Sequence, residues 1–273
     1  MQDVLATAAR WLSEADGLLI TAGAGMGIDS GLPDFRGPGG FWAAYPALRG
    51  ARLDFTEIAN PAAFERDPTL AWGFYGHRLD RYRQTPPHAG FHLLRDLAQG
   101  LPKGAFVFTS NVDGQFQKAG FPTERVCEIH GSIHYLQCLS DCKGRIWSAD
   151  GFVPQVDTAQ CRLRNALPHC PDCGGLARPN ILMFGDWGWV ERRTAQQQQA
   201  LAEWLPTVDR LVCIEIGAGT QIPTVRRFSE RCGGRLIHLN PNEPDLPAGI
   251  EGVALPLGGL AGLMTLAGAL SPP

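Results

Sequence analysis

The sequence has no apolar run long enough to cross a membrane and no excess of basic residues. None of its 273 residues lies in a stretch that approaches the roughly 18 apolar positions of a transmembrane helix. With 24 lysines and arginines against 27 acids, the net charge is −3, which argues against nucleic-acid binding as the main function. The N-terminus carries early acids and lacks the apolar core of a secretory signal. We therefore expect a cytoplasmic protein with no membrane partner and no direct nucleic-acid partner.

Cysteine is present at eight positions, but the sequence offers little reason to pair them as disulfides. In a chain of this length without a secretory signal, metal binding or free thiols are the more common use of cysteine. Hydrophobic residues make up 44% and charged residues 19%, as in ordinary globular proteins. The length is near the upper end for one domain, which favours one large domain with a small insert.

Short apolar runs alternate with helical patterns along most of the chain. This rhythm predicts an α/β fold with a Rossmann-like, doubly wound parallel sheet. The periodicity is lost between residues 137 and 178, where cysteine, glycine, proline and polar residues are frequent, so a small module is expected there. The expected strands cover residues 17–22, 105–109, 126–129, 180–184, 210–216 and 235–239.

Two cysteine pairs in this module predict a metal site. Cys138 and Cys142 are separated by three residues, and Cys170 and Cys173 by two, which is the spacing of zinc knuckles. Four thiolate ligands leave no coordination position for water, so the zinc would be structural. Cys161 and His169 lie between the pairs and are possible substitute ligands, and four unrelated free thiols remain the alternative.

A glycine-rich turn follows the first expected strand. Gly23, Gly25 and Gly27 would let the backbone approach a diphosphate, whose charge the N–H groups of the turn attract. The spacing departs from the G-x-G-x-x-G fingerprint of dinucleotide-binding folds, so a turn that only packs remains possible. The next loop combines an acid, an aromatic ring and a base, which suggests that it covers a ligand: Asp34, Phe35 and Arg36.

Polar or glycine-rich residues follow four further strands. Ligands of open α/β sheets bind beyond the carboxyl ends of the strands, so these residues are expected to converge on one site. Asn111 and Asp113 would bind a carboxamide or ribose, or would only cap the next helix. His130 would be a general base or a structural histidine. The complete set is Ser110, Asn111, Asp113, His130, Gly217, Ala218, Gly219 and Asn240.

Taken in order, these blocks resemble the sirtuins of bacterial type, a family of NAD-dependent protein deacylases. The resemblance covers residues 4–257. It rests on G-A-G at 23–25, S-G-L-P-D-F-R at 30–36, T-S-N-V-D at 109–113, H-G-S at 130–132, the four cysteines, R-P-N-I-L-M-F-G-D at 178–186, G-A-G-T at 217–220 and Asn240.

The resemblance implies a single catalytic domain over residues 1–273. A large NAD-binding part would cover about 1–136 and 179–273, a zinc module about 137–178, and a helical segment at about 43–85 would lie near the cleft. His130 would be the general base, with Asn111 as the second catalytic residue. The NAD-binding residues would be Gly23, Ala24, Gly25, Asp34, Phe35, Arg36, Ser110, Asn111, Asp113, Gly217, Ala218, Gly219 and Asn240.

The same resemblance implies that an acylated lysine of a peptide or protein enters the cleft as an added strand, bordered by Phe184 and Gly185. Its acyl group would be transferred to ADP-ribose, with release of nicotinamide and O-acyl-ADP-ribose. Tyr75 and Arg78, at i and i+3 of an expected helix, resemble the Tyr-x-x-Arg of members that remove succinyl or malonyl groups. A solvated arginine-rich helix is the alternative.

Two residues depart from the family pattern. Ser110 stands where the family usually has Gln, and Gly27 where it usually has Ser. Three hypotheses follow: an NAD-dependent lysine deacylase, an ADP-ribosyltransferase or NAD glycohydrolase on the same scaffold, and a non-catalytic NAD-binding module. The retained His130 argues against the third, because a protein that only binds NAD needs no base at that position.

Overall fold

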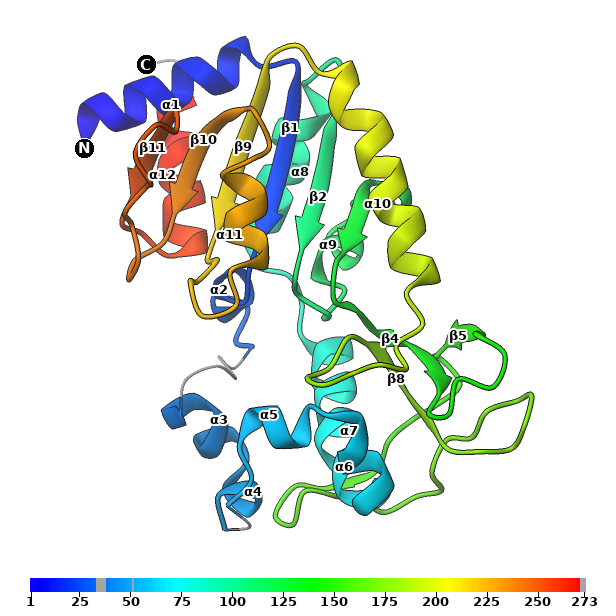
Figure 1. Ribbon diagram of the computed structural model, residues 1–273. Coiled ribbons are helices and arrows are strands. Elements are labelled where there is room, and N and C mark those ends of the chain that lie inside the picture. Colours follow the sequence, from blue (N-terminus) through cyan, green and yellow to red (C-terminus); the bar gives the residue numbers. More distant parts are fainter. Residues whose placement is uncertain (33–37, 51, 271–273) are drawn as a thin grey trace.

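The computed structural model describes residues 1–32, 38–50 and 52–270, which form a larger and a smaller part (Figure 1). The larger part contains a parallel sheet of six strands in the order β11-β10-β9-β1-β2-β3. The chain starts in the middle of the sheet, moves outward to β3, and later returns to the other side of β1, so the topological switch point lies between β1 and β9. This confirms the predicted Rossmann-like sheet. Its strands are β1 (Gly17–Ala22), β2 (Ala105–Thr109), β3 (Val126–Glu128), β9 (Leu211–Ile216), β10 (Arg235–Leu239) and β11 (Gly252–Leu255).

Helices cover both faces of this sheet because its central strands are apolar on both sides. Leu18 and Ile20 of β1 face one core, and Leu19 between them faces the other. The first core is completed by α1 (Gln2–Glu14), α8 (Ala89–Gln99) and α12 (Gly259–Leu270). The second is completed by α10 (Arg192–Trp204) and α11 (Thr224–Ser229). None of the described helices is long and apolar enough to cross a membrane.

The smaller part contains an antiparallel sheet in the order β5-β4-β8, packed against helices (Figure 1). The strand expected at residues 180–184 is displaced to β8 and lies in this sheet, not in the parallel one. The strands are β4 (Gly131–Cys138), β5 (Ile146–Ser148) and β8 (Ala177–Ile181), with a separate hairpin of β6 (Val156–Asp157) and β7 (Arg162–Leu163).

A third apolar core joins this sheet to helices that precede it in the chain by more than 45 residues. Trp72, Phe74 and Leu79 of the longest helix pack with Ile133 and Leu136 of β4. The helices of this part are α3 (Pro38–Ala44), α4 (Pro46–Gly50), α5 (Phe55–Ile58), α6 (Pro61–Arg66) and α7 (Pro68–Gln84). The shorter elements of the larger part are α2 (Gly25–Ile28), α9 (Gln115–Lys118), η1 (Thr123–Arg125) and η2 (Leu205–Thr207).

Two glycine turns meet at the switch point. A Cβ atom on Gly23 would lie 2.6 Å from the Gly217 carbonyl oxygen, and one on Gly25 would lie 2.6 Å from the Gly217 Cα. Gly217 itself has φ +59°, and its Cβ would lie 2.4 Å from the Gly25 Cα. Distances this short exclude any side chain, so these glycines allow the ends of β1 and β9 to touch backbone to backbone.

We expect Gly217→Ala to destabilise the protein far more than Gly233→Ala. Both positions have positive φ, but only at Gly217 is the space of the new methyl group occupied. The conformational cost alone is about 1 kcal/mol, and overpacking adds roughly 1–3 kcal/mol. Urea unfolding of both variants measures the difference. Equal losses of unfolding free energy would contradict the close-packing account of Gly217.

Candidate active site

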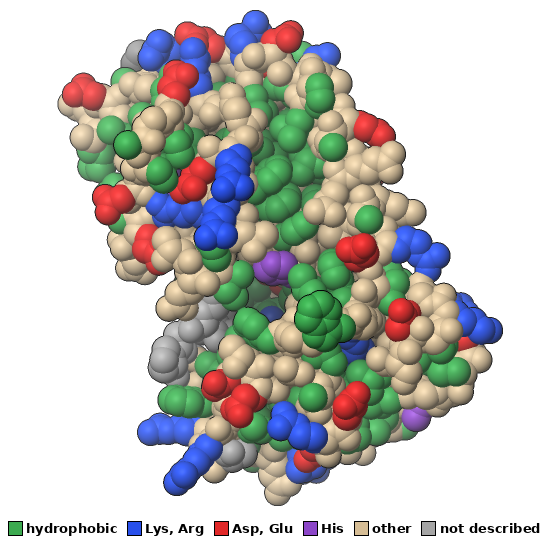
Figure 2. All heavy atoms as spheres, in the orientation of Figure 1, with side chains coloured by type: hydrophobic (Ala, Val, Ile, Leu, Met, Phe, Trp, Pro, Cys, Tyr) green, Lys and Arg blue, Asp and Glu red, His purple; other side chains and the backbone are tan. Residues whose placement is uncertain are grey.

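A cavity of about 290 Å³ lies beyond the carboxyl ends of β1, β2 and β3, where the smaller part faces the sheet. The molecular surface is hollowed between the two parts, and hydrophobic side chains gather around the hollow (Figure 2). A neighbouring cavity of about 320 Å³ lies along the ends of β1, β9 and β10. The two cavities share Ala24 and Ile222 as lining residues, so they form adjoining spaces at the switch point.

The loop after β2 is bonded to the first glycine turn. The side-chain amide of Asn111 donates to the Gly23 carbonyl over 2.9 Å, and the Thr109 hydroxyl donates to the Ala22 carbonyl over 2.8 Å. The Asn111 backbone N–H donates to the same Thr109 hydroxyl. Asn111 therefore joins two strand ends instead of capping a helix. Ser110, Asn111 and Asp113 all line the first cavity.

Asp113 is buried in the wall of this cavity. Its Oδ1 accepts the backbone N–H of Gln115, the first residue of α9, over 2.9 Å, while the N-cap position of that helix is occupied by Gly114. Burial raises the pKa of Asp113 to about 6, because desolvation disfavours its charged form. The other carboxylate oxygen faces Gly27, on which a Cβ would lie 3.7 Å from Oδ2 and 3.1 Å from Leu32 Cδ1. A side chain at Gly27 would crowd Leu32.

His130 lines the same cavity from the turn that joins β3 to β4. Its carbonyl accepts the Leu182 N–H over 2.9 Å, which attaches the turn to the segment after β8. The next residue must be glycine, because Gly131 has φ +77° and its Cβ would lie 2.2 Å from the Asn180 carbonyl oxygen. The histidine is thus held where the two sheets approach each other.

Of the predicted acyl-pocket pair, Arg78 lines the cavity, whereas Tyr75 is not among the described lining residues. Tyr75 is fully enclosed and stacks on Phe64 with ring centroids 5.5 Å apart. The phenol that reaches Arg78 belongs to Tyr82, which accepts from the Arg78 Nε over 3.1 Å and from Nη2 over 2.8 Å. Burial raises the pKa of Tyr82, which keeps the phenol neutral beside the guanidinium.

The segment after β8 forms another wall, to which Leu182, Met183 and Phe184 contribute. Phe184 is partly exposed and stands edge-on to Phe55, with centroids 5.9 Å apart. Gly185 follows with φ +63° and is not among the described residues that line the cavity.

The second cavity is bordered by the glycines of both turns and by the loop after β10. Gly25, Gly217, Gly219 and Asn240 line it, while Gly23 and Ala218 lie behind in the packed turns. The Asn240 amide donates to the Ala218 carbonyl over 2.9 Å. Asp34, Phe35 and Arg36, predicted to cover the ligand, lie outside the described residues.

Several lining residues were not predicted, among them Glu243, Ile222 and Tyr82. Glu243 lines the second cavity and accepts the Thr220 backbone N–H over 2.9 Å, which ties two loops together. Ile222 borders both cavities, and Tyr82 lies at i+4 from Arg78. Only Tyr82 carried a usable sequence signal, because an i+4 neighbour shares a helix face as readily as an i+3 neighbour.

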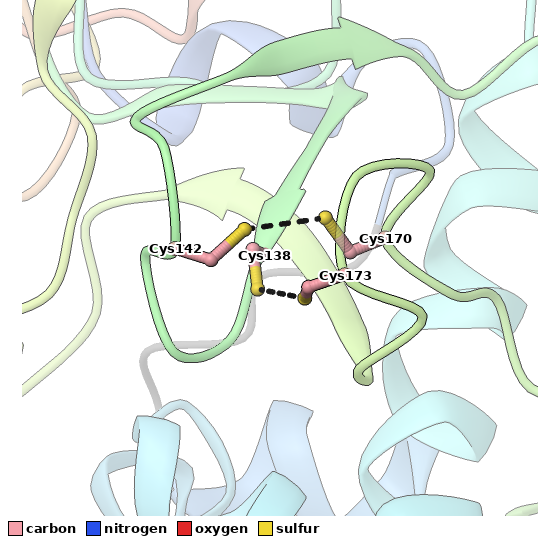
Figure 3. A group of neighbouring side chains, drawn as sticks. All are labelled: Cys138, Cys142, Cys170 and Cys173. Carbon is pink, nitrogen blue, oxygen red and sulfur yellow. Dashed lines mark hydrogen bonds between the residues drawn. The ribbon is translucent and has the colours of Figure 1, made fainter.

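The four predicted zinc ligands meet in the smaller part (Figure 3). Their sulfur atoms all lie within 4.8 Å of one another, and the pairs Cys138–Cys173 and Cys142–Cys170 are 3.7 Å apart. Zn–S bonds of about 2.3 Å in a tetrahedron place sulfurs about 3.8 Å apart, so the cluster has the dimensions of a structural zinc site. Cys161 packs in the apolar core of the smaller part instead. His169 is hydrogen-bonded through Nδ1 to the Gly174 carbonyl oxygen and to no cysteine sulfur in the described contacts.

Comparison with known proteins identifies relatives over most of the chain. A family model described as Sir2 family matches residues 23–221. The NAD-dependent protein deacylase of Thermococcus kodakarensis is 32% identical, over 87% of this chain and 84% of the relative. The mitochondrial NAD-dependent protein deacylase sirtuin-5 of Danio rerio is 34% identical, over 82% of this chain and 72% of the relative. A solved Sir2 homolog–NAD complex shares the fold, with a TM-score of 0.71 at 24% identity, over 99% of this chain and 95% of that one.

Asp113→Asn should stabilise the protein, and more so at high pH. Because the folded pKa of about 6 exceeds the ordinary 3.8, the carboxylate costs stability as pH rises from about 4 to about 6, and the full cost persists above that range. The amide avoids this cost and keeps an acceptor for Gln115. We expect a gain of roughly 1–3 kcal/mol near pH 8 and clearly less near pH 5.

Urea unfolding at both pH values measures this effect, with the exposed Asp96→Asn as a control that should change stability by less than about 0.5 kcal/mol. A gain of the same size at both pH values would show that the charge of Asp113 is not its cause.

Proposed function

The chain belongs to the Sir2 family, and from that premise we propose that it is an NAD-dependent protein-lysine deacylase. The observation that carries the proposal is the convergence of His130, Ser110, Asn111 and Asp113 on one cavity at the switch point of a Rossmann-like sheet. These side chains come from two different strand ends, and a histidine with an amide and an acid can bind and activate a polar substrate.

The two adjoining cavities fit a dinucleotide. The glycine turns that border the second cavity would bind its diphosphate, and Asn240 its far ribose. When bound, NAD supplies the ribose carbon that accepts the acyl oxygen as nicotinamide leaves. Asn111 and Asp113 would orient the carboxamide. His130 would take the proton of a ribose hydroxyl as a general base, a role that imidazole commonly fills.

The acylated lysine of a protein or peptide would reach this site along the wall formed by Phe184 and its neighbours. Phe184 lines the first cavity, and Gly185 follows it with φ +63°. The part built on the parallel sheet would bind NAD, and the smaller part, which carries the zinc module at about 137–178, would hold one side of the groove. Because none of the eight cysteines forms a disulfide and four of them are arranged as metal ligands, we propose a reducing, cytoplasmic location.

We further propose that the enzyme accepts acyl groups that end in a carboxylate, such as succinyl or malonyl. Arg78 places a guanidinium in the cavity wall, and the Tyr82 phenol beside it is neutral. A guanidinium of this kind binds a carboxylate with charge-assisted hydrogen bonds. Tyr75 would support Arg78 from behind, since the guanidinium lies 5.7 Å from its ring centroid.

His130→Ala should abolish deacylation, because it removes the proposed base. Incubation with labelled NAD and acetyl- or succinyl-lysine peptide, followed by mass spectrometry, should show O-acyl-ADP-ribose from the parent and at least about 100-fold less from the variant. His92→Ala, on α8 outside the cavity, should keep the parent rate. ADP-ribose attached to protein, or released without peptide, would instead favour a transferase or a glycohydrolase, and full turnover by His130→Ala would refute the assignment of the base.

Arg78→Met should change acyl preference. We expect the succinyl-peptide kcat/KM to fall by about 10- to 100-fold, because a charge-assisted pair contributes roughly 1.5–3 kcal/mol, and the acetyl-peptide value to fall by less than about threefold. Arg66→Met, at the exposed end of α6, serves as the control. Equal losses on both substrates would remove the carboxylate-binding role.

A further inference from the structure

Exposed apolar side chains are concentrated beside the mouth of the first cavity. Seven large hydrophobic side chains are exposed in the described part of the chain, and three of them lie among the six residues that directly follow β8. Leu182 is 38% exposed, Phe184 36% and Trp187 100%. We call these three residues the apolar ridge. Hydrophobic side chains crowd the hollowed face that Figure 2 shows. A cluster of this kind marks a binding surface more often than a scattered exposed residue does.

The segment that carries the ridge is anchored by a buried polar network. The Asp186 carboxylate is fully buried and forms a bidentate ion pair with Arg178, with distances of 2.7 and 2.8 Å. It also accepts the backbone N–H groups of Met183 and Gly188. Because Asp186 points inward and is bonded on both sides, the next side chain, Trp187, is directed into solvent.

Two further buried side chains hold the same segment. Gln137 of β4 donates to the Gly188 carbonyl over 2.8 Å and accepts the Val190 N–H over 3.1 Å. Asn180 of β8 donates to the Val190 carbonyl over 2.9 Å. A loop with this many buried bonds loses little conformational entropy when it binds a partner. The indole of Trp187 is therefore presented by a rigid support, which is the setting in which tryptophan contributes most to binding.

The position and the charge of the ridge indicate its partner. Leu182 and Phe184 also line the cavity proposed for the acylated lysine, so the chain on either side of that lysine leaves the cavity next to the ridge, three residues from Trp187 in sequence. The only charged residue between positions 182 and 190 is Asp186, which is buried and neutralised by Arg178. The ridge therefore offers apolar surface and no charge to a ligand.

We propose that the apolar ridge is a subsite that binds a bulky apolar side chain close to the acylated lysine of the substrate protein. The inference rests on the proposed function for the position of that lysine. It assigns Trp187 as a specificity-determining residue, which selects among acylated lysines by their neighbours and takes no part in the chemical step.

The test compares acetyl-lysine peptides of equal length that carry either leucine or serine at one of the two positions on each side of the lysine. At one of these positions or more, the parent should process the leucine peptide with a kcat/KM about tenfold higher than that of the serine peptide. The difference should lie in KM, and its size is that expected for a contact with tryptophan. Trp187→Ala should reduce this ratio to below about twofold, and Trp187→Phe should keep most of it. Met264→Ala, another exposed apolar residue, on α12, should keep the parent ratio.

A parent without any leucine preference, or a Trp187→Ala variant that retains it, would overturn the inference. Equilibrium binding of the same peptides, followed by fluorescence anisotropy, tests the subsite without turnover. Failure of the parent to process any acyl-lysine peptide with NAD would refute the proposed function. A Trp187-dependent leucine preference in binding would still support the ridge in that case, and equal binding of the leucine and serine peptides would overturn it.

Discussion

The contact between the two glycine turns is the constraint on which the site depends. Gly25 and Gly217 meet backbone to backbone, so the ends of β1 and β9 approach more closely than any side chain would allow. Asn111 then reaches the Gly23 carbonyl from β2, and Asn240 reaches the Ala218 carbonyl from β10. Each asparagine is thus positioned by a turn whose own place is set by the absence of Cβ atoms.

The smaller part is joined to this edge by a second close approach. Gly131 permits β4 to begin against the Asn180 carbonyl, and the His130 carbonyl accepts the Leu182 N–H. The histidine is therefore shared between the two sheets: β3, an edge strand of the parallel sheet, precedes it, and β4 of the antiparallel sheet follows it. A cavity between two such parts is lined by side chains from both. Two substrates bound in it can therefore be held next to each other, as a reaction between them needs.

What could be predicted from the sequence was mostly local. The bounds of β1, β2 and β10 were predicted to the residue, and those of β3 and β9 to within one residue, because each is a short apolar run bounded by glycine or polar residues. The zinc ligands were predicted because their spacing alone brings them together. β8 was assigned to the wrong sheet, since its antiparallel pairing with β4 joins segments about 45 residues apart and leaves no mark in the local pattern. β11 was missed because four weakly apolar residues do not define a strand by periodicity.

The geometry around the expected acyl-pocket pair could not be predicted for a different physical reason. Tyr75 and Tyr82 both share a helix face with Arg78, and which phenol bonds the guanidinium depends on Phe64, which stacks on Tyr75 and comes from another helix. Side-chain direction of this kind is a tertiary property. The close approach of Gly217 to Gly25 is also a tertiary property. Glycine in a turn is consistent both with phosphate binding and with close packing of the backbone. The structure shows the close packing, and phosphate binding remains compatible with it.

Buried charges are treated in two ways, and the difference separates support from chemistry. Arg178 and Asp186 neutralise each other with good geometry, and the carboxylate accepts two backbone N–H groups besides, as a structural ion pair requires. Asp113 is also buried, but its pKa is raised to about 6, so its ionised form is poorly compensated. A folded chain tolerates such a group where a ligand supplies the missing donors. The electrostatic imbalance therefore falls at the cavity that Asn111 and His130 share, and not in the network that holds its wall.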